Sequence, residues 1–200
     1  MRRMVIFLTL MTGYAFQVSY AQGNIESAFK EANDKFTYQG KPIHPGLVQQ
    51  FMSWMSDPGE PTTITVDVAA KHPNQYDDDE VDVKGKNICT KPDKDSAFFC
   101  YQWLGKMANG IHVLSTGDSG GGSGDFEDLV FVRFTIGDVI NLDGQKYKQL
   151  LMTVVREYNL GDRYGGDIKV LTDKVLIKAS TNTANEQVIN KDVELKFPVQ

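Results

Sequence analysis

The residues with the clearest chemical potential lie in a glycine-rich stretch of the second half of the chain. Gly117-Asp118-Ser119-Gly120-Gly121 has the order of the nucleophile segment of chymotrypsin-like serine proteases, in which a histidine activates the serine and backbone amides hold the oxyanion. The three histidines do not complete that site. Two directly precede proline, and His44 is too close in sequence to Ser119 to leave room for a protease's first barrel. The sequence therefore argues against a protease.

Without that motif, the same stretch predicts a loop that contacts a partner. Five of the eight residues from 117 to 124 are glycine; such loops form where the backbone needs positive φ or where another molecule approaches it closely. A strand rather than a helix is expected to follow, which excludes a phosphate-binding loop. The predicted contact residues are Ser119, Gly120, Gly121, Gly122 and Ser123. The alternative is a plain mobile connection between two strands.

A second glycine-flanked loop, Gly161 to Gly166, is also predicted to contact a partner. Arg163 offers a planar fork to a carboxylate and Tyr164 a flat apolar ring, a combination common in recognition surfaces. Asp162 is also predicted to be a contact residue of this loop. The alternative is that Asp162 and Arg163 only orient the turn.

The two loops together carry a resemblance. Gly-Gly-Gly-Ser-Gly-x-Phe at Gly120 to Phe126, with Gly-Asp-Arg-x-Gly-Gly at Gly161 to Gly166, resembles a pattern of uncharacterised exported bacterial proteins and covers roughly the second half of the chain. The resemblance brings no activity, cofactor or catalytic residue with it. It implies only that the two loops belong to one site.

An enzyme is the alternative function. A secreted hydrolase or carbohydrate-active enzyme would use Ser119 or Ser123 as nucleophile, or Asp118 with Asp125 or Asp162 as a carboxylate pair. Glycoside hydrolysis needs two carboxyl groups roughly 5–9.5 Å apart across a cleft. A serine without a histidine or carboxylate in reach, and acids that no cleft joins, would argue against an enzyme.

No cofactor and no metal site are predicted. Asp77-Asp78-Asp79-Glu80 with Asp82 could offer oxygens to Ca²⁺, but the order of an EF-hand loop is absent, so a solvated acidic loop is favoured. His112 alternates with Ile111 and Val113 and is expected on the opposite face of a strand, either facing solvent or hydrogen-bonded within the sheet.

The N-terminus predicts export. Arg2 and Arg3 precede an apolar run, and Ser19-Tyr20-Ala21 is typical of a signal-peptide cleavage site, so residues 1–21 are predicted to be removed. The run is short for a membrane span. In an oxidising compartment, periplasmic or extracellular, Cys89 and Cys100 are expected to form a disulfide closing a surface loop.

Residues 22–200 are predicted to form one α+β domain. Apolar spacing favours helices at 24–35 and 45–56, and strand patterns start near Ile64. The further predicted strands are Val81 to Cys89, Ala97 to Leu104, Ile111 to Thr116, Leu129 to Ile136, Lys146 to Tyr158, Ile168 to Ala179 and Val193 to Val199. We therefore expect two short N-terminal helices packed on a mainly antiparallel sheet of about seven or eight strands, curled into a sandwich or barrel.

Composition narrows the partner. The net charge of −5, which becomes −7 once residues 1–21 and their two arginines are removed, argues against a nucleic-acid partner because such binding depends on clustered Lys and Arg. The predicted function is an exported, non-catalytic binding protein for another protein or a glycan. A more specific hypothesis is a periplasmic inhibitor or immunity protein that plugs the active site of a secreted hydrolase.

Overall fold

A computed structural model describes residues 25–51, 65–67, 80–91, 97–140, 144–180 and 189–198 of the chain. The predicted signal peptide, residues 52–56 of the predicted second helix and the acidic residues 77–79 lie outside these described residues.

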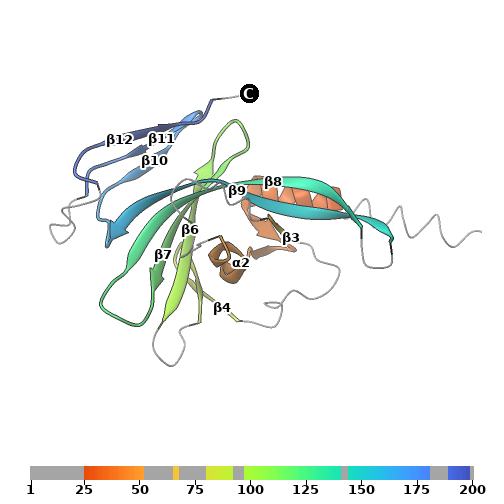
Figure 1. The fold of residues 1–200 in the computed structure, drawn as a ribbon, viewed down its shortest axis with the longest axis horizontal. Coiled ribbons are helices and arrows are strands. Elements are labelled where there is room, and N and C mark those ends of the chain that lie inside the picture. The colour runs from red at the N-terminus through yellow and green to blue at the C-terminus, as the bar shows by residue number, and fades with distance from the viewer. Residues whose placement is uncertain are drawn as a thin grey trace, which may run out of the picture.

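One large antiparallel sheet dominates the molecule (Figure 1). Its seven strands run in the order β3-β9-β8-β7-β6-β5-β4. Their bounds are β3 Thr65–Asp67, β4 Val81–Lys84, β5 Asn87–Thr90, β6 Phe98–Lys106, β7 His112–Ser119, β8 Phe126–Ile140 and β9 Lys146–Asp162. From β4 to β9 each strand pairs with the next in sequence, as expected for strands joined by turns. The sheet is open, with β3 and β4 at its edges.

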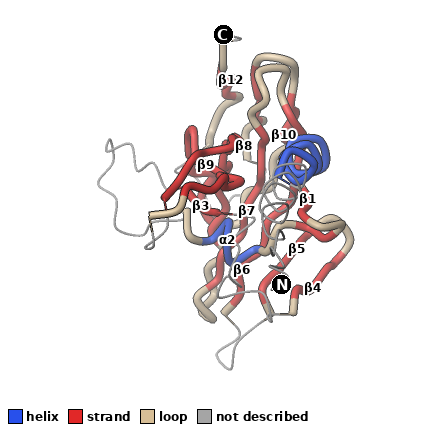
Figure 2. The backbone as a smooth tube through the Cα atoms, turned by 90° about the vertical axis from the view of Figure 1, so that its right-hand side faces the viewer, coloured by secondary structure: helices blue, strands red, loops and turns tan. Residues whose placement is uncertain are grey.

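Two smaller sheets and two helices complete the described fold. A three-stranded sheet contains β10 (Ile168–Val170), β11 (Lys174–Ile177) and β12 (Val193–Lys196), and a short hairpin pairs β1 (Thr37–Tyr38) with β2 (Lys41–Pro42). One helix covers residues 25–35, and α2 covers Pro45–Gln49. Figure 2 shows both helices in blue lying against the strands of the large sheet.

The large sheet buries a hydrophobic core on each face. On β7 and β8, Leu114, Val130 and Val132 belong to a core shared with the helices, which we call the helix-side core. Their immediate neighbours Val113 and Leu129 belong to a core shared with the three-stranded sheet, which we call the small-sheet core. Because successive side chains of a strand point to opposite faces, central strands covered on both faces must be apolar at nearly every position.

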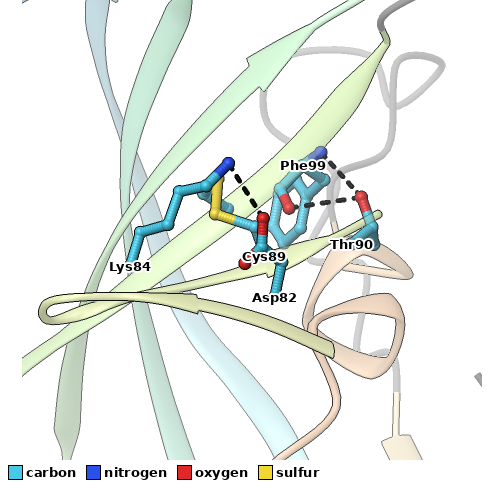
Figure 3. Close-up of a disulfide and its surroundings, with 6 residues drawn as sticks. Asp82, Lys84, Cys89, Thr90 and Phe99 are labelled. Carbon is cyan, nitrogen blue, oxygen red and sulfur yellow. Dashed lines mark hydrogen bonds and ion pairs between the residues drawn. A yellow bond between two sulfur atoms is a disulfide. The ribbon is translucent and has the colours of Figure 1, made fainter. Parts of the chain in front are cut away.

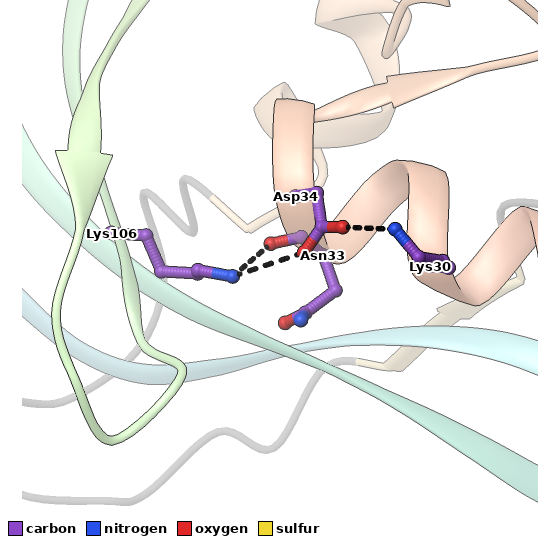
Figure 4. A network of polar contacts seen from close by, with 4 residues as sticks. All are labelled: Lys30, Asn33, Asp34 and Lys106. Atoms are coloured by element: carbon purple, nitrogen blue, oxygen red, sulfur yellow. Dashed lines mark hydrogen bonds and ion pairs between the residues drawn. The ribbon is translucent and has the colours of Figure 1, made fainter.

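Polar contacts fasten the N-terminal segment to the sheet. The Tyr101 hydroxyl donates to the backbone oxygen of Ile43 at 2.5 Å. Lys106 of β6 reaches the helix of residues 25–35. Its Nζ atom donates to the backbone carbonyl oxygen of Asn33 at 2.7 Å and pairs with the Asp34 carboxylate at 3.4 Å (Figure 4). Lys30 pairs with Asp34 at 2.8 Å, one turn away. These pairs are exposed and add little energy, so the buried apolar face must hold the helix in place.

The predicted α+β class is wrong, because the structure is mostly β. Among the described residues only two helices are found, and α2 ends at Gln49, much earlier than the predicted residue 56. The run from Val81 to Cys89 is not one strand but a hairpin that turns at Gly85, which has φ +66°. The run from Ile168 to Ala179 is likewise a hairpin, β10–β11. The large sheet does not close into a barrel.

The sequence patterns misled for a local reason. The apolar stripe of 45–56 has helical spacing, but spacing alone does not fix where a helix ends. Two-residue turns interrupt apolar runs so briefly that two short strands resemble one long strand. By contrast, the antiparallel pairing is confirmed throughout the described sheets.

Candidate functional site

The two glycine loops lie side by side at one end of the large sheet. One loop joins β7 to β8 and the other follows β9, and Phe126 at the start of β8 pairs with Asp162 at the end of β9. The backbone amide of Asp125 donates to Asp162 Oδ1 at 2.8 Å. The backbone amide of Arg163 donates to the backbone carbonyl oxygen of Asp125, also at 2.8 Å. Arg163 also pairs with Asp162 Oδ2 at 3.2 Å. Loops about 40 residues apart in sequence thus form one continuous surface.

Some glycines of these loops are required by the fold. Gly121 and Gly161 have φ of +82° and +95°, which residues with a Cβ rarely adopt. A Cβ on Gly166 would stand 2.3 Å from Tyr164 Oη and 2.7 Å from the Lys178 oxygen. A side chain at Gly166 would therefore displace the Tyr164 ring.

Other glycines are not required by the fold. Gly120 and Gly122 have ordinary φ, and a Cβ on either would have nothing within 4 Å. Gly117 also has ordinary φ, and its Cβ would lie 3.5 Å from Asp125 Oδ1, an ordinary contact distance. Glycine at these positions leaves the backbone open to approach from outside.

Tyr164 does not present its ring at this surface. The side chain is buried in the small-sheet core with 8% exposure, and its hydroxyl donates to the Lys178 oxygen at 2.5 Å. Burial raises the pKa of the Tyr164 hydroxyl to about 12. The residue anchors the second loop to the three-stranded sheet, and Asp162 and Arg163 remain at the surface of that loop.

Carboxylates with raised pKa values gather around the two loops. Burial, together with the neighbouring Asp125 and Asp162, raises the pKa of Glu127 to about 7, although its carboxylate accepts a hydrogen bond from the Tyr164 amide. Burial and Asp162 raise the pKa of Asp125, and Arg163 partly opposes them. Burial and Asp125 raise the pKa of Asp118. This end of the sheet holds more negative charge than its own cations neutralise.

Asp125 and Glu127 share an open depression of about 280 Å³ on the face that carries the small-sheet core. The strands β5, β6 and β7 supply the remaining wall. The lining residues are Asn87, Phe98, Cys100, Tyr101, Gln102, Ser115, Thr116, Gly117, Asp125 and Glu127. The Oδ1 atom of Asp125 is buried and has no hydrogen-bond partner among the described residues.

Glu127 was missed by the sequence analysis. Along β8 it shares a face with Leu129 and Phe131, which are both fully buried. A carboxylate in line with two core positions of an alternating strand was the available signal. Its position beside Asp125 could not be read from the pattern, because it depends on how the loop folds back.

The serines lack the partners that a nucleophile needs. Ser119 ends β7 and is buried with 7% exposure, and Ser123 lies in the exposed loop. In the described part of the chain, neither serine is hydrogen-bonded to a histidine or a carboxylate. Serine-based hydrolysis therefore has no support from the geometry.

His112 lies far from this chemistry, in the helix-side core. It is on the face opposite Val113, as predicted, but it is fully buried, and neither ring nitrogen has a hydrogen-bond partner within the described structure. The prediction of a solvent-facing or hydrogen-bonded histidine is therefore wrong. The aromatic rings of Phe36 and Phe134 lie 5.5 and 5.2 Å from it.

The predicted disulfide is present and forms part of the depression. Cys89 and Cys100 are directly paired across β5 and β6, with Cα atoms 4.0 Å apart (Figure 3). Within the described structure, β5 and β6 pair only at this position and at the neighbouring Ile88–Tyr101. Thr90 Oγ1 adds a hydrogen bond from the Phe99 amide at 3.0 Å. The disulfide thus fixes the β4–β5 hairpin to the sheet.

Comparison of the chain with protein-family models, curated proteins and solved structures finds no match. Over the described residues, no three His, Cys, Asp or Glu side chains are grouped so that they could hold a metal ion.

Proposed function

We propose that this protein is an exported, non-catalytic binding protein that contacts another macromolecule through the surface formed by its two glycine loops. The observation that carries the proposal is the pair of hydrogen bonds joining Asp125 to Asp162 and to Arg163. These bonds give two glycine-rich segments a common surface on a rigid sheet, an arrangement typical of binding sites. Gly120 and Gly122, which the fold itself does not require, support the same proposal.

Export is part of the proposal. The Cys89–Cys100 disulfide is compatible with an oxidising compartment. No helix among the described residues is both long and apolar enough to cross a membrane. The finer hypothesis is a periplasmic inhibitor or immunity protein, in which the loops enter the active site of a secreted hydrolase.

Partner capture by loop variants tests the proposal. The tagged chain would be incubated with an extract of exported proteins, and captured partners identified by mass spectrometry and then purified. Gly120→Trp and Gly122→Trp place a large side chain where the structure leaves open space at ordinary φ, so the fold should persist. Ile140→Trp is the matched control, because Ile140 is 63% exposed at the far end of β8. We expect at least a tenfold loss of affinity for the loop variants only; equal binding by all three would refute the role of the loops.

A carboxylate-dependent hydrolase is the second candidate. It is favoured by one observation, namely that Glu127, with a pKa raised to about 7, shares a depression with Asp125. A protonated Glu could act as general acid and an ionised Asp as its partner. Assays with chromogenic glycosides and esters decide this: activity that disappears in both Glu127→Gln and Asp125→Asn would support an enzyme, and no turnover above buffer would exclude one for these substrates.

A further inference from the structure

The depression beside the two loops has a floor without a side chain. Gly117 lies on β7 between Cys100 on β6 and Glu127 on β8, in direct register with both. Its φ is ordinary, so the backbone does not need glycine there. Glycine inside a strand weakens the strand and commonly marks a site where another group approaches the backbone closely. Glycine at this position of the sheet leaves space beside the Asp125 carboxylate, whose Oδ1 atom would lie 3.5 Å from a Cβ there.

The charge of the depression is negative and favours a cationic group as its occupant. Asp125 and Glu127 both line it, and none of the described residues that line it is basic. The nearby cation Arg163 contacts Asp162 at 3.2 Å. The buried Asp125 Oδ1 has no hydrogen-bond partner among the described residues. A cationic donor entering the depression would pair with the carboxylates of Asp125 and Glu127 and offset the repulsion between them.

One part of the wall, formed by Phe98 and Cys100, suits the apolar stem of a long side chain. Phe98 and the half-buried Cys100 of the disulfide line the depression next to the polar groups of Gln102 and Ser115. Lysine and arginine carry an apolar stem and a charged head, and they bury the stem along such surfaces. A neutral sugar would leave the negative charge of the carboxylates uncompensated.

We propose that the depression at Gly117 receives a lysine or arginine side chain from a protein partner, whose charge pairs with Asp125 and Glu127. This inference rests on the proposed function, because the depression adjoins the loop surface. It specifies that the partner of the proposed function is a protein with a basic contact loop. The acidic character of the whole chain, with a net charge of −5, favours the approach of such a partner.

A peptide titration tests the inference without knowledge of the partner. The probe is acetyl-Gly-Arg-Gly-amide, and the matched neutral probe is acetyl-Gly-citrulline-Gly-amide, which has nearly the same shape. Binding is followed by two-dimensional NMR of the ¹⁵N-labelled, disulfide-bonded protein at pH 8. We expect saturable shifts of the Gly117 and Glu127 amides with the arginine peptide, and at least tenfold weaker binding of the citrulline peptide.

Three variants locate the effect. Glu127→Gln removes one carboxylate and Gly117→Val fills the floor; each should weaken binding of the arginine peptide at least fivefold. Asp138→Asn is the control, because Asp138 lies on the same strand with 79% of its side chain exposed and should bind as the wild type does. Circular dichroism confirms that each variant is folded. If Gly117→Val does not fold, Glu127→Gln alone decides.

Several results would overturn the inference. Equal binding of both peptides, absence of shifts at the Gly117 and Glu127 amides, or binding unchanged in Glu127→Gln would each exclude a charge-dependent pocket. Shifts at these amides with chitotriose and not with the arginine peptide would make the depression a sugar site. A different result would refute this inference but not the proposed function. If a captured partner is lost by Gly122→Trp but still binds Glu127→Gln and Gly117→Val, the loop surface binds the partner and the depression does not receive a basic side chain.

Discussion

Replacing His112 with leucine is expected to remove about 3 kcal/mol of the acid sensitivity of the folded state between pH 7 and pH 4. The imidazole is fully buried, with both nitrogens unpartnered among the described residues. Burial lowers the pKa of His112 from 6.5 to about 4; Lys106 acts in the same direction and Asp34 opposes it. The rings of Phe36, Trp103 and Phe134 surround the imidazole and offer no strong acceptor for a proton.

The magnitude follows from the two pKa values of His112. Between pH 6.5 and 4 the unfolded chain binds a proton at His112 and the folded chain does not. Protonation of His112 therefore does not lower the free energy of unfolding above pH 6.5, and it lowers this free energy progressively as the pH falls below 6.5. The loss amounts to about 3 kcal/mol at pH 4. Leucine has nearly the volume of histidine and does not titrate. The variant also removes two buried polar atoms, whose burial costs more than the roughly 1 kcal/mol of lost ring contacts. We therefore expect H112L to be at least as stable as the wild type at pH 7.

The assay is urea unfolding at pH 7 and pH 4 with the disulfide intact, followed by far-ultraviolet circular dichroism. Tryptophan fluorescence is less suitable, because the Trp103 ring lies 6.0 Å from His112 and would respond to the substitution itself. Glu127 titrates in an overlapping range with the opposite sign, so the variant is compared with the wild type at each pH. Two results would refute the reasoning: a pH dependence in H112L within about 1 kcal/mol of the wild type, or an NMR titration that gives His112 a pKa near 6.5.

Three further changes have expected outcomes. Because the folded state favours protonated Glu127, the wild type loses stability as the pH rises from 4.5 through about 7. E127Q lacks this loss, so between pH 4.5 and pH 8 its free energy of unfolding in urea should rise by about 1 kcal/mol relative to the wild type, allowing for partial solvent screening. A difference between the two proteins that is the same at both pH values would contradict this. G166A should cost about 2–4 kcal/mol in the same measurement, because its Cβ would meet Tyr164 Oη at 2.3 Å; a cost within about 0.5 kcal/mol would show that the ring moves freely. The double variant Cys89→Ser/Cys100→Ser should lose about 3 kcal/mol and expose the β4–β5 hairpin to rapid hydrogen exchange; protection equal to that of β7 would mean that the disulfide does not hold this edge.

Much of the strand content could be predicted because alternation is a local property. The runs that became β6, β7, β8 and β9 were all placed correctly in outline, since a half-buried strand imposes a period of two on its own sequence. The Cys89–Cys100 pair followed from having only two cysteines in a chain predicted to be exported. The prediction was wrong where the sequence signal was only a few residues long, namely in the short hairpins and at the end of α2.

The candidate site was only partly predictable for a different reason. The sequence singled out both glycine loops, but it could not show that Tyr164 is buried or that Glu127 faces the depression. Tyr164 is buried because the three-stranded sheet packs on the face of the large sheet that carries Leu129 and Phe131, and Glu127 lines the depression because β7 and β8 place it beside Gly117. Which residues of a strand are covered is decided by elements distant in sequence.

By itself, the sequence determined that the segments of β6 to β9 are extended, which loops are rich in glycine, which cysteines pair and the sign of the net charge. Only the tertiary structure decided that the loops ending β7 and β9 meet, that Asp125 and Glu127 share one depression, and that His112 is buried without a hydrogen-bond partner. The physical reason is that propensity and alternation act between residues close in the chain. The neighbours of a loop are instead set by strand order and register, which are selected by burying apolar side chains on both faces of the sheet at once.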